Sequence, residues 1–149
     1  MRLESGAFRM GSAIPKKYAC EGENTSPPLN FSDIPPKTKS LALVCDDPDA
    51  PMGTFVHWVL WNIRPDMKGI GEGESAKVFC VEGSNDFGRA GYGGPCPPRG
   101  HGPHRYFFKL YALDSMLSLN PGATEAELEN AMKGHILEKA ELMGTYERK

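Results

Sequence analysis

Residues 55–63 read FVHWVLWNI, a stretch dominated by aromatic and β-branched side chains. Two other stretches have the same character, SLALVCD at residues 40–46 and HRYFFKLYAL at residues 104–113, and all three have Pro or Gly nearby. Runs of this kind are typical of buried strands. We therefore expect these segments to be the central strands of one sheet. The core is expected to contain six apolar side chains of these strands: Phe55, Trp58, Val59, Trp61, Phe107 and Phe108.

Three shorter segments, residues 3–8, 29–31 and 77–81, are also expected to be strands. Two proline pairs, at residues 27–28 and 35–36, flank the second of them, and proline cannot donate a hydrogen bond to a neighbouring strand. We expect these short strands to lie at sheet edges.

Helical signals are confined to the C-terminal part of the chain. Thr124 and Glu127 have the spacing of a capping box, and the apolar residues that follow recur with a helical period. One helix is expected to start near Ala123 and to break or end by about Ala140, followed by a last strand in which Leu142, Gly144 and Tyr146 alternate. The expected fold class is mainly β, with one or two C-terminal helices.

Length and composition exclude several classes of protein. The 149 residues suit one domain, residues 1–149, because single cores usually form over roughly 100–200 residues. The 17 Lys and Arg nearly balance the 19 Asp and Glu, so the chain lacks the basic excess that nucleic-acid binding needs. No stretch approaches the roughly 18 apolar residues of a membrane span, and the first ten residues lack a signal-peptide core. A cytoplasmic protein without a membrane span is therefore expected.

The four cysteines, at positions 20, 45, 80 and 96, are widely spaced and form no CxxC pair or zinc-type pattern. Reduced structural thiols are the expectation. Disulfides stay an alternative for a secreted or hyperthermophilic protein, because such proteins use them.

The most unusual segment is EGSNDFGRAGYGGPCPPRGHGP, residues 82–103, in which 11 of 22 residues are Gly or Pro. Loops of this length in compact domains are usually functional or disordered. The segment lacks the Gly-Lys-Ser/Thr of a nucleotide phosphate loop and the GxGxxG pattern of dinucleotide-binding proteins. It leads into a strand whose alternation places His104, Tyr106 and Phe108 on one face and Arg105 on the other.

A second polar group follows the strand at residues 40–46, where Asp47 and Asp49 lie beside prolines, and His57 stands among apolar residues. Buried polar groups need partners, so these residues are candidates for a site. One alternative is a metal enzyme in which Asp47, His57 and His104 form a 2-His-1-carboxylate site. Another is a hydrolase with Cys96 as the nucleophile and either histidine as the base.

Several motifs together resemble the phosphatidylethanolamine-binding protein family, also known as Raf kinase inhibitor-like proteins. They are DPDAP at residues 47–51, His57 in its apolar strand, GYGGP at 91–95 and PRGHGPHRY at 98–106. CEGENTSPPL at 20–29 and GTY at 144–146 are similar to the short prokaryotic branch. The resemblance implies a large central antiparallel sheet, a smaller second sheet and a small pocket for phosphate-like anions.

The resemblance also implies which residues form that pocket: Asp47, His57, His104 and Tyr106, with Pro98 and Gly94 on the rim. Imidazole N–H groups, a tyrosine hydroxyl and backbone amides can hold a phosphate, so no metal or cofactor is expected. Asp47 is expected to orient one imidazole. Arg105 points to the other face and is expected to pair with Asp49.

The expected function is therefore non-enzymatic binding of a phosphate-like anion or a phosphorylated head group, which could be regulatory, with no catalytic residue. Inhibition of a protease or kinase through the surface around the pocket is the alternative. The longer eukaryotic relatives have an extra C-terminal helix beside the pocket, whereas this sequence stops at Lys149 soon after its last motif, so we expect their kinase inhibition to be a poor guide to the function of this protein. By family analogy the protein is expected to be a homodimer.

Overall fold

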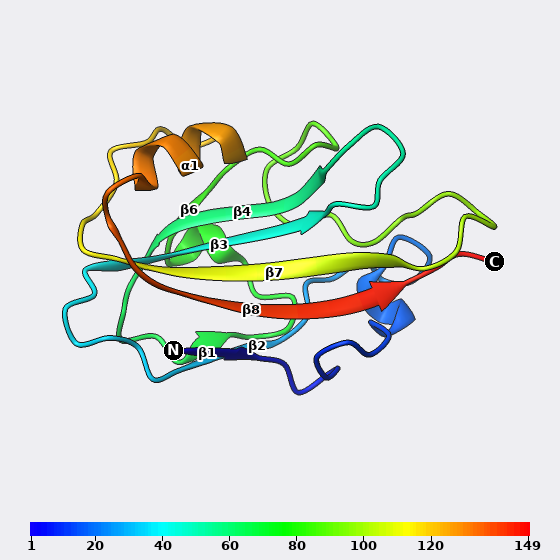
Figure 1. Cartoon of the computed structure of the whole chain (residues 1–149), viewed down its shortest axis with the longest axis horizontal. Helices are drawn as coiled ribbons and strands as arrows, with labels where there is room; N and C mark the ends of the chain where they lie inside the picture. The colour runs from blue at the N-terminus through cyan, green and yellow to red at the C-terminus, as the bar shows by residue number, and fades with distance from the viewer.

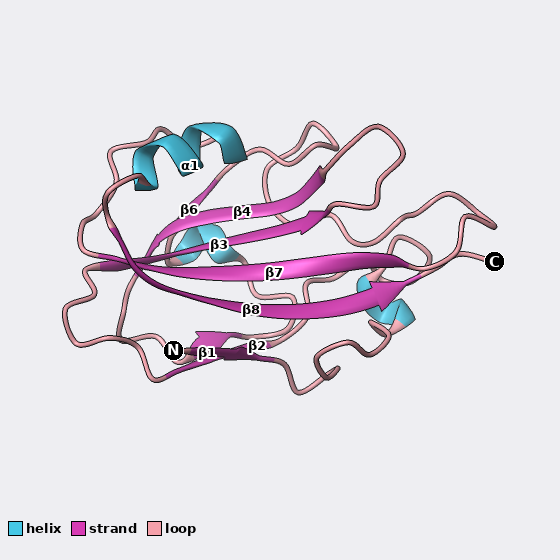
Figure 2. Cartoon of the chain, viewed as in Figure 1, coloured by secondary structure: helices cyan, strands magenta, loops and turns pink.

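The computed structural model describes all residues from Met1 to Lys149 and contains two antiparallel sheets (Figures 1 and 2). The larger sheet contains, in spatial order, β6 (Val81–Glu82), β4 (Phe55–Ile63), β3 (Ser40–Asp47), β7 (His104–Leu113) and β8 (Ile136–Tyr146). The smaller sheet contains β1 (Arg2–Glu4), β2 (Leu29–Ser32) and β5 (Gly69–Ile70). The helices are α1 (Glu125–Met132) and two single 3-10 turns, η1 (Lys16–Tyr18) and η2 (Ala76–Val78). The mainly β fold expected from the sequence is confirmed.

The three predicted central strands are neighbours in the larger sheet. β3 lies between β4 and β7, and all eight of its residues are buried. Because side chains alternate across a strand, β3 contributes Leu43 to one core and Val44 to the other. This burial on both faces explains why β3 is continuously apolar from Leu41 to Cys45.

Two cores hold the layers together. The larger fills the space between the two sheets and includes Leu29 of β2 and Trp58 of β4. The smaller lies on the other face, under α1, and includes Trp61 and Leu128. Of the six predicted core residues four are buried, whereas Phe55 and Phe107 are only half-buried. Phe107 faces outward, where the Arg105 guanidinium lies 5.6 Å from its ring centre.

The C-terminal helix begins as predicted but ends earlier. Thr124 and Glu127 form the capping box, each side chain accepting a backbone N–H of the other residue. The helix stops at Met132, where its buried face ends, and Gly134 then adopts a positive φ of 79°. The last strand starts at Ile136 and pairs with β7 along its whole length. The helix thus ends before Ala140, but the helical spacing expected through His135 and Ile136 is wrong, since residues from Ile136 onward pair with β7.

The expectation that residues 29–31 lie at a sheet edge is wrong, because β2 is the middle strand of the smaller sheet and pairs with both β1 and β5; the prolines at 27–28 and 35–36 lie outside it. The other two predicted edge strands are shorter than expected. Residues 77–81 contribute one turn of η2 and only the start of β6, because the amides of Phe79 and Cys80 both donate to the Ala76 carbonyl. The strand expected over residues 3–8 ends at Glu4, and Ala7 then donates to the Ser5 hydroxyl in a turn.

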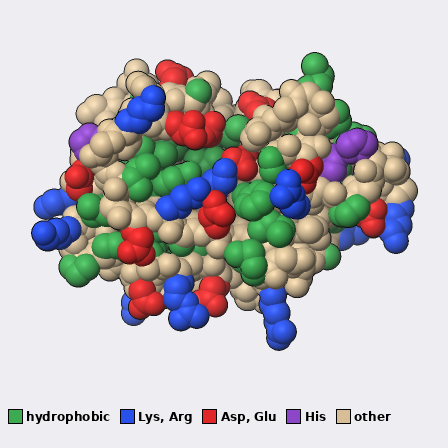
Figure 3. Space-filling view, in the orientation of Figure 1, with side chains coloured by type: hydrophobic (Ala, Val, Ile, Leu, Met, Phe, Trp, Pro, Cys, Tyr) green, Lys and Arg blue, Asp and Glu red, His purple; other side chains and the backbone are tan.

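Charges of both signs are interspersed with apolar side chains on the face shown in Figure 3, and no field of one sign covers it. This arrangement agrees with the formal net charge of −2. A helix with the length and apolar character needed to cross a membrane does not occur in the structure.

Candidate functional site

A cavity of about 280 Å³ lies where the carboxyl end of β3 meets the amino ends of β4 and β7, at the end of the sheet away from α1 (Figure 1). Four polar residues line it: Asp47, His57, His104 and Tyr106. The remaining lining residues are mainly apolar and include the half-buried Phe55. The antiparallel order of the three strands brings these residues together, although they are far apart in sequence.

Asp47 and His104 form a buried pair. The Nδ1 atom of His104 lies 2.7 Å from Oδ2 of Asp47, and the two side chains are only 2% and 4% exposed, respectively. The other carboxylate oxygen accepts the backbone N–H of Asp49 at 2.7 Å. Because a carboxylate only accepts, His104 donates through Nδ1, and its Nε2 faces away from Asp47. The expectation that Asp47 orients one imidazole is confirmed.

His101 extends this pair, and sequence reasoning did not single it out. Its Nδ1 atom lies 2.6 Å from Nε2 of His104, and its ring is exposed. The signal that could have identified it is the His-x-x-His spacing at the start of β7. A hydrogen bond between two ring nitrogens needs one donor, so one of the two nitrogens carries a proton, and both ring nitrogens of His104 have partners within the protein.

His57 uses one ring nitrogen, Nδ1, in a hydrogen bond within the protein. Its Nδ1 atom lies 2.7 Å from the Gly93 carbonyl, which only accepts, so Nδ1 carries a proton. Burial lowers the pKa of His57 below its ordinary value, and the Gly93 carbonyl and Asp47 offset only part of this effect. Neutral His57 therefore has a lone pair on Nε2, and only its imidazolium form can donate from both nitrogens.

Tyr106 supplies a hydroxyl that stays protonated. The residue is 1% exposed, and burial together with Asp47 raises its pKa far above the ordinary tyrosine value. Its ring meets the His57 ring edge-on at a centroid distance of 5.2 Å. The hydroxyl can therefore donate a hydrogen bond throughout the physiological pH range.

The two predicted rim residues have different positions. Pro98 lines the cavity, but Gly94 does not. Gly94 packs behind the site, where a Cβ atom would lie 2.1 Å from the Tyr18 carbonyl oxygen, and its N–H donates to Asn24. Its role in the structure is a close backbone approach that only glycine permits.

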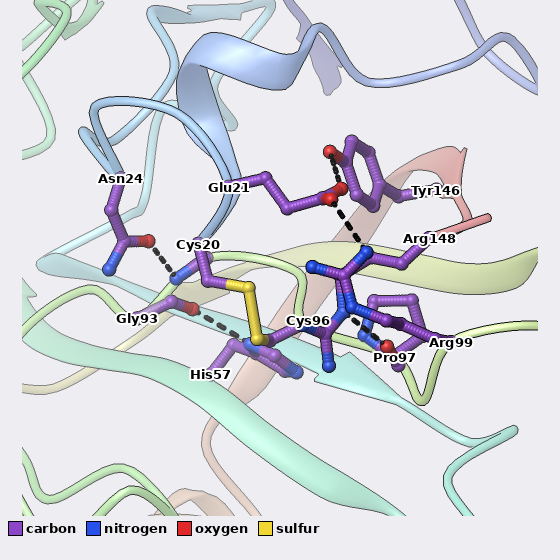
Figure 4. Close-up of a disulfide and its surroundings, with 11 residues drawn as sticks. Cys20, Glu21, Asn24, His57, Gly93, Cys96, Pro97, Arg99, Tyr146 and Arg148 are labelled. Atoms are coloured by element: carbon purple, nitrogen blue, oxygen red, sulfur yellow. Dashed lines mark hydrogen bonds and ion pairs between the residues drawn. A yellow bond between two sulfur atoms is a disulfide. The ribbon is translucent and has the colours of Figure 1, made fainter.

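A disulfide joins Cys20 to Cys96, so the expectation of four reduced thiols is wrong for this pair, while Cys45 and Cys80 are free. Cys96 lines the cavity. Figure 4 shows the bond joining the Cys20 turn to the segment of Gly93 and Pro97. The N–H of Cys20 also donates to the Pro95 carbonyl at 3.0 Å. The bond therefore attaches one cavity wall to the N-terminal part of the chain.

The structure tests the alternatives and the ion pair expected from the sequence. No group of three or more His, Cys, Asp or Glu side chains is arranged to hold a metal ion, so the 2-His-1-carboxylate alternative lacks a ligand set. The hydrolase alternative lacks its thiol, because Cys96 is in the disulfide. Arg105 pairs with both carboxylate oxygens of Asp49, as expected, and lowers the pKa of Asp49 to about 2.

Comparison with known proteins gives consistent matches. The family model described as phosphatidylethanolamine-binding protein matches residues 4–147. A UPF0098 protein of Pyrococcus horikoshii is 53% identical over 97% of this chain and 76% of its own length.

Solved structures match along the whole chain. One from Chlamydia trachomatis, named a phosphatidylethanolamine-binding protein homologue, has a TM-score of 0.94 at 47% identity and covers 99% of this chain and 97% of its own. YbcL of Escherichia coli, described as a member of the mammalian family, has a TM-score of 0.92 at 32% identity, over 99% and 98%. A carboxypeptidase Y inhibitor, solved with its cognate proteinase, has a TM-score of 0.59 at 20% identity, over 99% and 83%, and so shares the fold alone.

Proposed function

The chain belongs to the phosphatidylethanolamine-binding protein family, and from this we propose that it binds a phosphate-like anion or a phosphorylated head group without converting it chemically. The observation that carries the proposal is the convergence of His57, His104 and Tyr106 on one cavity, with Asp47 holding one imidazole. These groups can supply hydrogen bonds and positive charge to an anion without a metal.

The protonation states define how such an anion would bind. The Tyr106 hydroxyl donates at any physiological pH, whereas Nε2 of His57 donates to the ligand only after His57 has taken up a proton, because Nδ1 already donates to the Gly93 carbonyl. Proton uptake then gives the cavity the positive charge that balances the nearby Asp47 carboxylate. Anion binding is therefore expected to be coupled to proton uptake.

Replacing the oriented histidine tests the proposal directly. In this proposal the anion takes the place of the exposed His101 ring at Nε2 of His104. His104→Ala should then weaken binding of inorganic phosphate by roughly ten- to a hundredfold, because it removes a charge-assisted hydrogen bond of about 1.5–3 kcal/mol. Calorimetric titration gives the dissociation constant, and circular dichroism checks folding. His135→Ala is the matched control, because His135 is exposed and pairs with Asp114 away from the cavity. Unchanged phosphate binding in both His104→Ala and His57→Ala would refute the proposal.

The pH dependence of sulfate binding separates an anion site from a metal site. Sulfate stays a dianion between about pH 5 and 8, so its affinity should rise as the pH falls and the imidazoles are protonated. Because the pKa of His57 is lowered, the rise should continue below the ordinary histidine value of about 6.5. A metal site would behave in the opposite way, since metals bind neutral imidazole. Sulfate affinity that is flat or rises with pH, together with tight zinc binding at pH 8, would contradict the anion site.

Protease inhibition is the second candidate. The shared fold with the carboxypeptidase Y inhibitor favours it, although at 20% identity no inhibitory residue of that protein can be assigned to this chain. Titrating serine carboxypeptidase activity with this protein tests it, and full activity at a large molar excess of the protein would exclude it for that class. It stays a prediction that the protein binds a kinase, lies in the cytoplasm and forms a homodimer.

A further inference from the structure

Phe87 lies over the cavity although it belongs to an exposed turn. Its side chain is 38% exposed, which is unusual for phenylalanine. Its ring centre lies 4.8 Å from that of Phe55 and 5.3 Å from that of His57, with edge-to-face geometry at 69° and 77°. The ring therefore forms part of the cavity wall while one side remains open to solvent.

The turn that carries Phe87 is held by buried hydrogen bonds. Asn85 is 4% exposed, and its side-chain oxygen accepts the N–H groups of Phe87 and Arg89 at 2.9 and 3.2 Å. Its amide nitrogen donates to the Gly91 carbonyl at 2.9 Å. The turn is thus fixed from within rather than by packing of the phenylalanine ring.

Two further contacts set the position of Phe87 relative to the site. The Asp86 carboxylate accepts the N–H of Val56, and the Asp86 N–H donates to the Val56 carbonyl, at 2.7 and 2.8 Å. These bonds attach the turn to β4 beside His57.

A Cβ atom on Gly93 would lie 2.4 Å from the Phe87 ring, so the close approach of the ring requires glycine there. An exposed aromatic ring held in this way is already ordered for binding.

The cavity is larger than a bare phosphate needs. Its volume of about 280 Å³ is near the lower end for small-molecule pockets, which begin at about 300 Å³. Its polar groups are few, and its other walls include Pro51, Pro98 and the two phenylalanines. A phosphate on the histidines and tyrosine would leave this apolar part unfilled, so a ligand with an apolar substituent would bury more surface.

From this geometry we infer that Phe87 determines the specificity of the site by selecting anions that carry a flat apolar group, such as aryl phosphomonoesters. This inference rests on the proposed function and adds the chemical class of the ligand's organic part. A cationic substituent fits less well, because the Arg89 guanidinium already lies 5.9 Å from the Phe87 ring centre and would repel it.

Calorimetry with three probes tests the inference: inorganic phosphate, phenyl phosphate and 2-aminoethyl phosphate. The wild-type protein should bind phenyl phosphate about tenfold more tightly than inorganic phosphate, through ring contacts with Phe87 and Phe55. Phe87→Ala should remove this advantage, so that the variant binds phenyl phosphate and inorganic phosphate with similar affinity. Phe87→Leu, which keeps an apolar side chain, should retain part of it. Met116→Ala is the control, because Met116 is an exposed apolar residue that does not line the cavity.

The results distinguish a failure of the Phe87 inference from a failure of the proposed anion site. The inference is overturned if phenyl phosphate binds no better than inorganic phosphate, or if Phe87→Ala weakens both equally. It is also overturned if 2-aminoethyl phosphate shows the larger dependence on Phe87, since the wall would then select a cation. If the wild-type protein binds none of the three, the proposed anion site itself fails.

Discussion

Trp58→Ala is expected to lower the free energy of unfolding by about 3–5 kcal/mol, the range for truncating a fully buried large aromatic residue. Trp58 is 1% exposed and lies in the core between the two sheets. Its ring meets that of Tyr92 edge-on at 5.3 Å, and the Tyr92 hydroxyl donates to the Tyr18 carbonyl. The substitution would leave a void beside Tyr92, in the segment that leads to the cavity.

Urea denaturation followed by circular dichroism measures this loss. Phe107→Ala is the matched control, because Phe107 is also an aromatic residue of the larger sheet but lies half-buried on its outer face. Its loss should be smaller than that of Trp58→Ala. A denaturation midpoint for Trp58→Ala close to that of the wild type would contradict the position of the ring in the core.

Removing the disulfide is expected to have the second large effect. Cys20 and Cys96 are 76 residues apart, and closing a loop of that length lowers the entropy of the unfolded chain by an amount worth about 4 kcal/mol. The hydrogen bonds between the two segments remain after reduction, so the folded cavity wall should loosen rather than detach. Cys20→Ser should therefore lower the free energy of unfolding by about 2–4 kcal/mol.

A dithiol reductant provides the internal check on this prediction. The wild-type protein should lose stability in the reductant and approach the Cys20→Ser variant, which should itself not respond. Cys80→Ser is the control, because Cys80 is a half-buried free thiol and should show a small effect with the reductant response intact. If the reductant leaves the wild-type denaturation midpoint unchanged after a free-thiol assay shows complete reduction, the stabilising role of the bond is excluded.

The sequence by itself determined the features that depend on local pattern. Residues 40–46, 55–63 and 104–113 form buried strands, as expected for short runs of aromatic and β-branched side chains that are stabilised by burial in a sheet. The alternation along β7 separates His104 from Arg105, and the observed burial alternates from His104 to Lys109 before the last four residues of the strand, 110–113, are all buried. The capping box at Thr124 also acts over one turn, so it too could be identified from its spacing.

The tertiary structure alone decided the features that depend on partners distant in sequence. The helix ends at Met132 because β7 offers a full ladder of hydrogen bonds to residues 136–146, which outweighs local helical propensity. Cysteine spacing could not identify the Cys20–Cys96 pair, because only the folded chain brings two residues 76 positions apart within bonding distance. Phe87 acquires its place at the cavity in the same way, through Phe55 and His57 on β4. Contacts across space depend on how strands are ordered in a sheet, and a linear pattern of residue types does not contain that order.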